Sequence, residues 1–112
     1  MAKDEIKREI YKQVIMSDVI VTDQREHSVA LIYDHKIHDA PILTTKGTDK
    51  IAKLILRIAK KRKIWIKVDN EYSRLLYEDI EINSPISEKF YKPVSYILAN
   101  VEKTSHWNIY LI

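Results

Sequence analysis

The chain has 112 residues, of which 46% are hydrophobic and 31% are charged. This length and composition are typical of a single folded domain, residues 1–112, and they exclude an extended disordered chain. The formal net charge of +3 permits acidic partners without requiring them. Without cysteine the chain has no disulfide, thiolate metal site or cysteine nucleophile, and its single glycine, Gly47, excludes glycine-rich phosphate loops.

The first expected element is an N-terminal helix within residues 1–16. Ile6, Ile10 and Val14 lie four residues apart, a spacing typical of an amphipathic helix over residues 3–16. The charged start is not that of a signal peptide, and no apolar run is long enough to span a membrane. We therefore expect a soluble, cytoplasmic protein.

A strand, a polar turn and a second strand are expected next. Val19 to Thr22 is a β-branched run, which is typical of a short buried strand. Asp23 to His27 is polar and predicts a turn. Ser28 to Tyr33 has the alternation of a strand, so Val29 and Ala30 are expected on opposite faces.

The middle of the chain predicts a polar loop, a strand, a helix and a fourth strand. Pro41 to Thr45 forms the third strand, with proline at its first position. Thr48 is the expected N-cap of a helix that ends in the cationic run Lys60–Lys63, which suits the negative end of a helix dipole. The apolar stripe of this helix consists of Ile51, Leu54, Ile55, Ile58 and Ala59. Ile64 to Val68 alternates as a strand.

Two further helices are expected after the fourth strand. Asp69 or Asn70 can cap a short helix through Leu76, and residues 77–84 are expected to be irregular. Ser87 caps a last helix from Glu88 to about Val101. This order predicts an α/β fold with a small, mixed, four-stranded sheet flanked by about four helices.

Three further features suggest chemistry or contacts. His35 and His38 lie among carboxylates and suggest a metal-dependent enzyme, but the fixed ligand spacing of zinc modules is missing. A solvated loop is therefore favoured there, with no metal and no cofactor. The run Lys60–Lys63 supports an alternative, a basic nucleic-acid-associated domain, although no binding motif accompanies the charge. The apolar tail, residues 103–112, offers Trp107, Tyr110 and Leu111 either for self-packing or for a partner or oligomer contact.

A series of segments in a specific order carries a resemblance to a known family. The segments are Asp18–Thr22, Val29–Asp34, Ala40–Leu43, Lys46-Gly47, the helix Ile51–Ala59, Leu75–Tyr77, Ile82, Ile86–Tyr91 and Val94. In this order they resemble the cytoplasmic domain of the FlhB/YscU family, the export-switch proteins of flagellar and type III secretion systems. The likeness covers about residues 17–102. It implies the family's fold and a role in protein export.

The turn between the first two strands departs from the family. Members carry Asn-Pro-Thr-His there, and the asparagine amide attacks its own backbone carbonyl, so that the chain breaks before the proline. Here Asp23, Gln24, Arg25 and Glu26 occupy the same place. A carboxylate is ionised at neutral pH and replaces the amide poorly. His27 lies one position beyond the motif histidine and is expected to face the wrong way to act.

The resemblance therefore implies an export-switch-like domain that does not cleave itself and is not an enzyme. We expect it to bind components or substrates of a flagellar or type III export apparatus and to take part in secretion or its substrate-specificity control. The turn Asp23–Glu26 would form part of the surface that partners read. The family places this domain behind a membrane portion, whereas the Met-Ala start here favours a free-standing soluble paralogue.

Overall fold

The structure, a computed structural model, describes residues 3–33 and 40–90. Its helices are α1 (Lys3–Ile15), α2 (Asp49–Arg62) and α3 (Asn70–Asp79), followed by the short 3₁₀ helix η1 (Glu88–Phe90). Its strands are β1 (Val19–Thr22), β2 (His27–Ile32), β3 (Ile42–Thr48), β4 (Trp65–Val68) and β5 (Ser84–Pro85). None of the described helices has an apolar stretch long enough to cross a membrane. The predictions for His35, His38, Trp107, Tyr110 and Leu111 lie outside the described residues.

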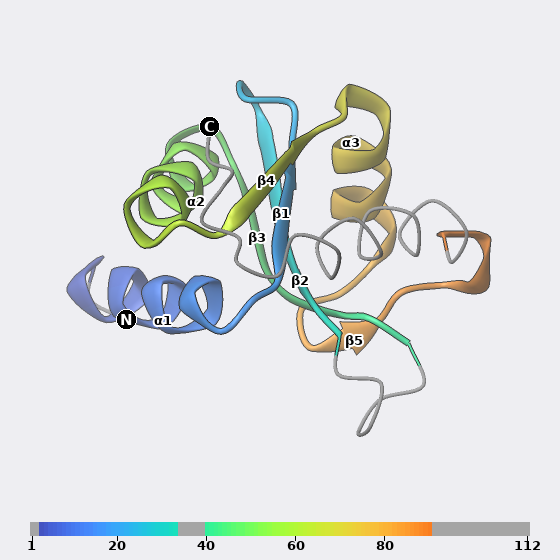
Figure 1. Cartoon of the computed structure of the whole chain (residues 1–112), viewed down its shortest axis with the longest axis horizontal. Coiled ribbons are helices and arrows are strands. Elements are labelled where there is room, and N and C mark those ends of the chain that lie inside the picture. The colour runs from blue at the N-terminus through green and yellow to red at the C-terminus, as the bar shows by residue number, and fades with distance from the viewer. Residues whose placement is uncertain (1–2, 34–39, 91–112) are drawn as a thin grey trace.

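The strands form one mixed sheet in the order β4-β1-β2-β3-β5 (Figure 1). β1 pairs antiparallel with β2, where Val19 lies opposite Leu31, and parallel with β4, where Val19 lies opposite Trp65. A parallel partner requires a crossover, and α2 supplies it between β3 and β4. β1 therefore lies inside the sheet, and all four of its residues are buried, as its β-branched run predicts.

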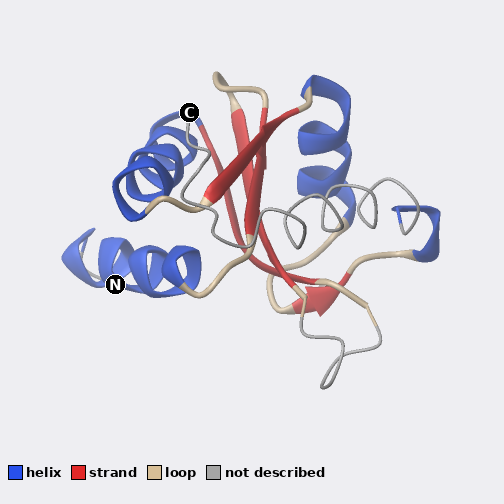
Figure 2. Cartoon of the chain, viewed as in Figure 1, coloured by secondary structure: helices blue, strands red, loops and turns tan. Residues whose placement is uncertain are grey.

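Helices cover both faces of the sheet, with α1 and α2 on one side and α3 on the other (Figure 2). Alternation along the strands sends neighbouring residues to opposite faces, so Val29 joins one core cluster and Ala30 the other, as expected. The cluster beneath α3 consists of Val19, Val21, Val29, Leu31, Leu43, Leu76, Ile80, Ile86 and Phe90. The cluster beneath α1 and α2 consists of Ile10, Val14, Ile20, Ala30, Ile55, Leu56, Ile58 and Ala59.

The described part of the chain corrects two counts. The sheet has five strands where four were expected, because β5 forms at the end of residues 77–84, which were predicted to be irregular, and extends to Pro85. Asn83 donates to the Leu43 carbonyl at 2.6 Å and Ile86 donates to the Pro41 carbonyl at 3.0 Å, so this stretch pairs with the free edge of β3. Among the described residues, three α-helices and η1 are present where about four helices were expected. Of the predicted helix from Glu88 to about Val101, the described residues form only η1.

The helix ends follow the sequence signals in part. Asp69 is the N-cap of α3, and its carboxylate accepts from the backbone N–H of Tyr72 at 2.9 Å, as predicted. α3 runs on to Asp79, beyond the expected end. Thr48 is the N-cap of α2, but its side chain makes no capping hydrogen bond. The cationic end of α2 is confirmed, and Lys63 closes it in the left-handed conformation.

Candidate functional site

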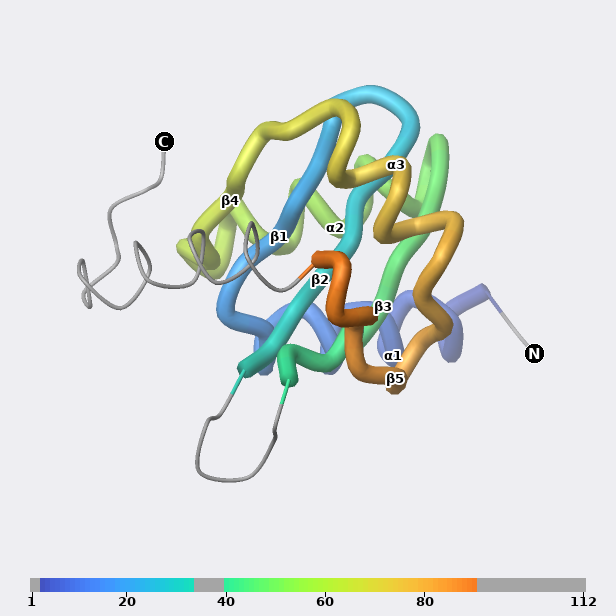
Figure 3. The backbone as a smooth tube through the Cα atoms, turned by 90° about the vertical axis from the view of Figure 1, so that its right-hand side faces the viewer, coloured from blue at the N-terminus to red at the C-terminus, as the bar shows by residue number. Residues whose placement is uncertain are grey.

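The turn between β1 and β2, residues 23–26, lies at the same end of the molecule as the start of α3 (Figure 3). Backbone hydrogen bonds fasten it to both helices that begin nearby. The Asp49 N–H at the start of α2 donates to the Glu26 carbonyl at 3.0 Å, and the Asp69 N–H donates to the Thr22 carbonyl at 2.9 Å. The two helix starts therefore hold the base of the turn in place.

The carboxylate of Asp23 organises the turn from inside. Its Oδ1 accepts hydrogen bonds from the backbone N–H groups of Arg25 at 2.8 Å, Glu26 at 2.8 Å and His27 at 2.9 Å. Its Oδ2 lies 3.0 Å from Nδ1 of His27. Only 14% of the Asp23 side chain is exposed. Aspartate is a frequent turn residue because its side chain can satisfy backbone donors in this way.

Two opposed effects set the pKa of Asp23. Burial raises it, but the hydrogen bonds from the backbone and the ring of His27, and from the N–H groups of Arg25 and Glu26, outweigh burial and hold the pKa well below its usual range. Asp23 is therefore ionised at neutral pH. An ionised carboxylate can only accept, so Nδ1 of His27 carries the proton in their hydrogen bond.

His27 was expected to face away from the turn. This expectation is wrong in one respect, because the His27 ring hydrogen-bonds to the Asp23 carboxylate within the turn. His27 begins β2 and points to the same face as Val29, the face that α3 covers. Its ring lies 5.2 Å from the ring of Tyr77 on α3, centroid to centroid. Lys46 Nζ lies 4.9 Å from the centroid of the same tyrosine ring. His27 thus connects the turn to α3.

Thr22 is a site residue that the sequence reasoning missed. It is fully buried at the end of β1. Its hydroxyl donates to the His27 carbonyl at 2.8 Å, accepts from the Gln24 N–H at 2.8 Å, and lies 3.0 Å from Oγ of Ser28. The sequence feature that could have indicated this role is the pair Thr22-Asp23 at the end of a strand, because both residue types hydrogen-bond to nearby backbone groups in turns.

Gln24 has a backbone conformation that proline cannot adopt. Its φ is 69°, in the left-handed region, whereas the proline ring fixes φ near −65°. The turn is therefore a different turn from any that has proline at this place. The side chains of Gln24, Arg25 and Glu26 are exposed. Within residues 3–33 and 40–90, no group of three or more histidine, aspartate and glutamate side chains is placed to hold a metal ion.

The fold and this turn together define a small α/β domain with a strand–turn–strand segment anchored to two helices. The sequence model of the FlhB HrpN YscU SpaS Family matches residues 1–101, and the chain belongs to this family. The chain is 36% identical to the flagellar biosynthetic protein FlhB of Bacillus subtilis (strain 168), over 87% of this chain and 27% of that protein. It is 31% identical to FlhB of Salmonella typhimurium, over 97% of this chain and 28% of that protein.

Solved structures agree with this assignment. The cytoplasmic domain of FlhB from Shewanella putrefaciens superimposes with a TM-score of 0.84 and 28% identity, covering 91% of this chain and 84% of that one. An EscU C-terminal domain carrying an asparagine-to-aspartate mutation gives a TM-score of 0.83 and 25% identity, covering 90% and 94% of the two chains.

The resemblance to the export-switch family is thus confirmed, and the fold matches that of the cytoplasmic domain. The chain spans about a quarter of the length of the curated relatives it matches, 27% of the Bacillus subtilis protein and 28% of the Salmonella typhimurium protein. The nucleic-acid alternative finds no support in these comparisons, because the family and the relatives named above are those of flagellar and type III export.

Proposed function

We propose that this domain works in flagellar or type III protein export as an uncut binding domain. It binds components or substrates of the export apparatus at the cytoplasmic face of the membrane and takes part in control of which substrates are exported. Family membership supports the link to export. One observation supports the uncut state: Asp23 stands at the cleavage position with both carboxylate oxygens engaged.

The chemistry at the turn is unfavourable to self-cleavage. The family reaction needs a side-chain amide nitrogen to attack the backbone carbonyl of its own residue, and Asp23 has no such nitrogen. Its low pKa keeps it ionised, and its hydrogen bonds withdraw both oxygens from attack. The next residue, Gln24, also lacks the proline ring that completes the family motif.

The exposed residues of the turn are the proposed recognition surface. Gln24, Arg25 and Glu26 present an amide, a cation and a carboxylate to solvent. The backbone beneath them is held by Asp23 and by bonds to the starts of α2 and α3. A rigid turn loses little conformational entropy when a partner binds, which favours a role in recognition.

We also infer that α1 belongs to the same domain as the export-switch-like part, residues 17–102. Ile10 and Val14 of α1 share a core cluster with Ile20 of β1 and Ile55 of α2. An N-terminal helix that only linked two bodies would not contribute buried residues to this cluster.

Two measurements test the proposed function. Intact mass after long incubation at neutral pH should show one species, and two fragments that divide after Asp23 would overturn the uncut state. A pull-down from cells that carry an export apparatus should retain an apparatus protein. The retention should fall when Arg25 and Glu26 are replaced by serine and persist when the exposed pair Arg74 and Glu78 of α3 is replaced instead. Absence of any apparatus protein would contradict the binding role.

A further inference from the structure

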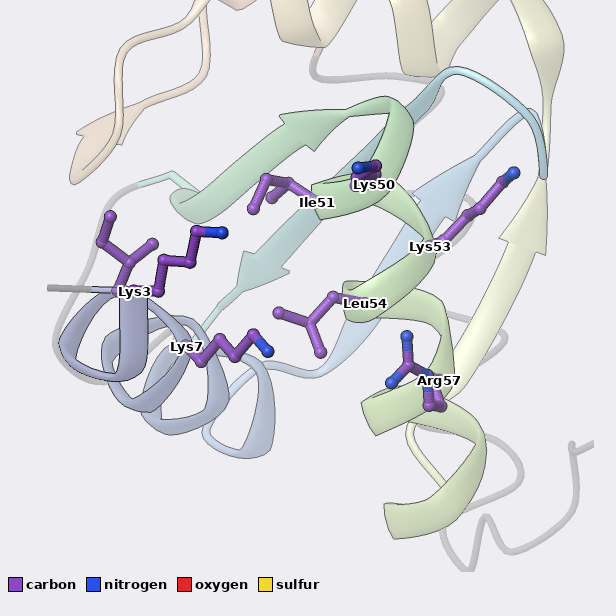
Figure 4. Close-up of a pocket in the computed structure, with 8 residues that line it drawn as sticks. Lys3, Lys7, Lys50, Ile51, Lys53, Leu54 and Arg57 are labelled. Carbon is purple, nitrogen blue, oxygen red and sulfur yellow. The ribbon is translucent and has the colours of Figure 1, made fainter.

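A basic groove runs between α1 and α2, on the face of the sheet opposite α3 (Figure 4). Its volume is about 450 Å³. The cationic side chains that line it are Lys3, Lys7, Lys50, Lys53 and Arg57, and the apolar ones are Ile6, Ile51 and Leu54. Leu54 points from α2 toward α1, and Lys7 points from α1 toward α2. We call this feature the α1–α2 groove.

The α1–α2 groove concentrates positive charge. Of the described side chains that line it, five are cations and none is a carboxylate, while the formal net charge of the whole chain is only +3. The ion pairs between described residues involve His27, Arg74 and Lys89, and none of them involves a cation of the groove. Cations gathered without an ion-pair partner among the described residues raise the local potential and attract an anionic ligand.

The floor of the groove is aliphatic and partly open to solvent. Ile6 is 39% exposed, so part of the aliphatic floor faces solvent. A neighbouring hollow of about 380 Å³ shares Ile6 and Ile51 with the groove and continues to Ile82, which is 46% exposed. Isoleucines line this hollow together with polar side chains that include Glu9 and Lys46, so the mainly aliphatic floor is that of the groove itself. None of the described residues that line either hollow has an aromatic ring on which a nucleotide base could stack.

We propose that the α1–α2 groove binds an acidic amphipathic helix of a partner protein. Such a helix lays its apolar face on Ile6, Ile51 and Leu54, and its carboxylates reach the lysines on either side. An aliphatic floor with a cationic rim matches this ligand in both shape and charge. A nucleic acid would use the charge but would leave the apolar floor without a partner. This surface is distinct from the turn at Asp23 and does not depend on whether the chain is cut.

A synthetic probe tests the groove without a cellular partner. The probe is a fluorescent helical peptide of about four turns, with leucines along one face and glutamates on the others. We expect the chain to bind it with an affinity that falls as salt is raised. A peptide of the same composition in scrambled order should bind more weakly, because it has no continuous apolar face. Absence of binding, or equal binding of the scrambled peptide, would overturn the proposal.

Two triple variants distinguish binding at the groove from a general attraction of the peptide to positive charge. Lys7→Gln, Lys50→Gln and Arg57→Gln together should weaken binding about tenfold. Lys60→Gln, Lys61→Gln and Lys63→Gln remove the same charge from the end of α2 and should change the affinity by less than about twofold. Equal losses in both variants would contradict the groove. Tighter binding of a single-stranded oligonucleotide, lost in the second variant, would favour the nucleic-acid alternative instead.

A matched pair of apolar variants tests the floor. Ile6 and Ile15 both lie on α1 and are both 39% exposed, but only Ile6 lines the groove. Ile6→Gln should weaken peptide binding about fivefold, and Ile15→Gln should leave it unchanged. Both replacements keep a good helix former at an exposed position, so circular dichroism should show equal folding. A loss of affinity with Ile15→Gln equal to that with Ile6→Gln would overturn the proposed floor.

Discussion

Asp23 and His27 are joined twice, through the backbone N–H of His27 at 2.9 Å from Oδ1 and through its ring Nδ1 at 3.0 Å from Oδ2. The first bond closes the turn between β1 and β2. The second bond holds the histidine ring where it meets Tyr77 of α3. One carboxylate therefore determines both the shape of the turn and its attachment to the helix behind it.

Replacement of this carboxylate should destabilise the domain. Asp23→Ala removes the acceptor for three backbone N–H groups and for the ring of His27, and we expect it to lower the free energy of unfolding by about 1 to 2 kcal/mol. Urea denaturation at neutral pH measures the loss. Asp23→Asn keeps one acceptor oxygen and should lose less, so an equal loss in both variants would contradict the role of Oδ1.

The stability difference between the natural chain and Asp23→Ala should depend on pH in a direction that the pKa of Asp23 determines. The pKa of Asp23 is lowered by folding, so the ionised carboxylate stabilises the folded state above its unfolded pKa, about 3.9. That contribution is lost as the pH falls toward the lower folded pKa. The stability difference between the natural chain and Asp23→Ala should therefore be constant from neutral pH to about pH 4 and shrink below it. A difference that stays constant down to about pH 2.5 would contradict this account.

Restoring the amide alone should not restore cleavage. In Asp23→Asn the backbone N–H groups require the side-chain oxygen at the Oδ1 position, which directs the amide nitrogen to the Oδ2 position beside His27. With the ring proton on Nε2, Nδ1 of His27 can accept from this amide nitrogen, which is then poorly placed to attack the backbone carbonyl. We expect a single species by intact mass after prolonged incubation. Fragments ending at residue 23 would show that the amide is sufficient.

Gln24 should respond in opposite directions to glycine and proline. Its left-handed φ of 69° is strained for most residues, so Gln24→Gly should raise the free energy of unfolding by about 0.5 kcal/mol. Gln24→Pro requires another φ and removes the N–H that donates to Thr22, so it should lower stability by at least about 2 kcal/mol. Thermal denaturation of both variants checks the sign. A stabilising proline would show that the turn adopts a different φ.

Lys46 should contribute far more to the stability of the domain than an exposed lysine does. Its Nζ donates to the carbonyls of Tyr77 and Ile80 at 2.7 Å each, at the end of α3. Lys46→Met keeps the aliphatic stem but removes both bonds, which should cost about 2 kcal/mol. Lys89 is a suitable control, because it forms an exposed pair with Asp79, and Lys89→Met should cost less than about 0.5 kcal/mol. Chemical denaturation measures both losses of stability. Equal losses in Lys46→Met and Lys89→Met would contradict the proposed contribution of the two Lys46 hydrogen bonds.

Gly47 is required by the approach of α2 to β3. A Cβ at this position would lie 2.6 Å from Cβ of Ile51 and closer still to its Cγ2. Gly47→Ala should therefore lower the free energy of unfolding by about 1 to 3 kcal/mol. Ile51→Ala removes the Cγ2 contact, so the double variant should lose less than the sum of the two single losses in a double-mutant cycle. Strict additivity would exclude this contact as the cause.

Local patterns in the sequence were enough for much of the fold. The β-branched run Val19–Thr22 predicted a buried strand, and period-two alternation placed Val29 and Ala30 on opposite faces. The apolar stripe of α2 and the Asp69 cap of α3 also follow from spacing along the chain. These features depend on residues within a few positions of one another, so a linear pattern contains them. The ordered segments behind the family resemblance are of the same kind.

Only the tertiary structure decided the features that join distant parts of the chain. β5 exists because its backbone meets the edge of β3, and Lys46 binds carbonyls more than thirty residues away. The α1–α2 groove exists because two separate helices bring their lysines to one side. The sequence by itself determined which family scaffold this chain adopts and which residues, Asp23 to Glu26, occupy the turn between its first two strands. The contact between the His27 ring and Asp23 forms with Gln24 in the left-handed conformation and with the ring packed against Tyr77 of α3. The spacing of residues along the chain specifies neither of these.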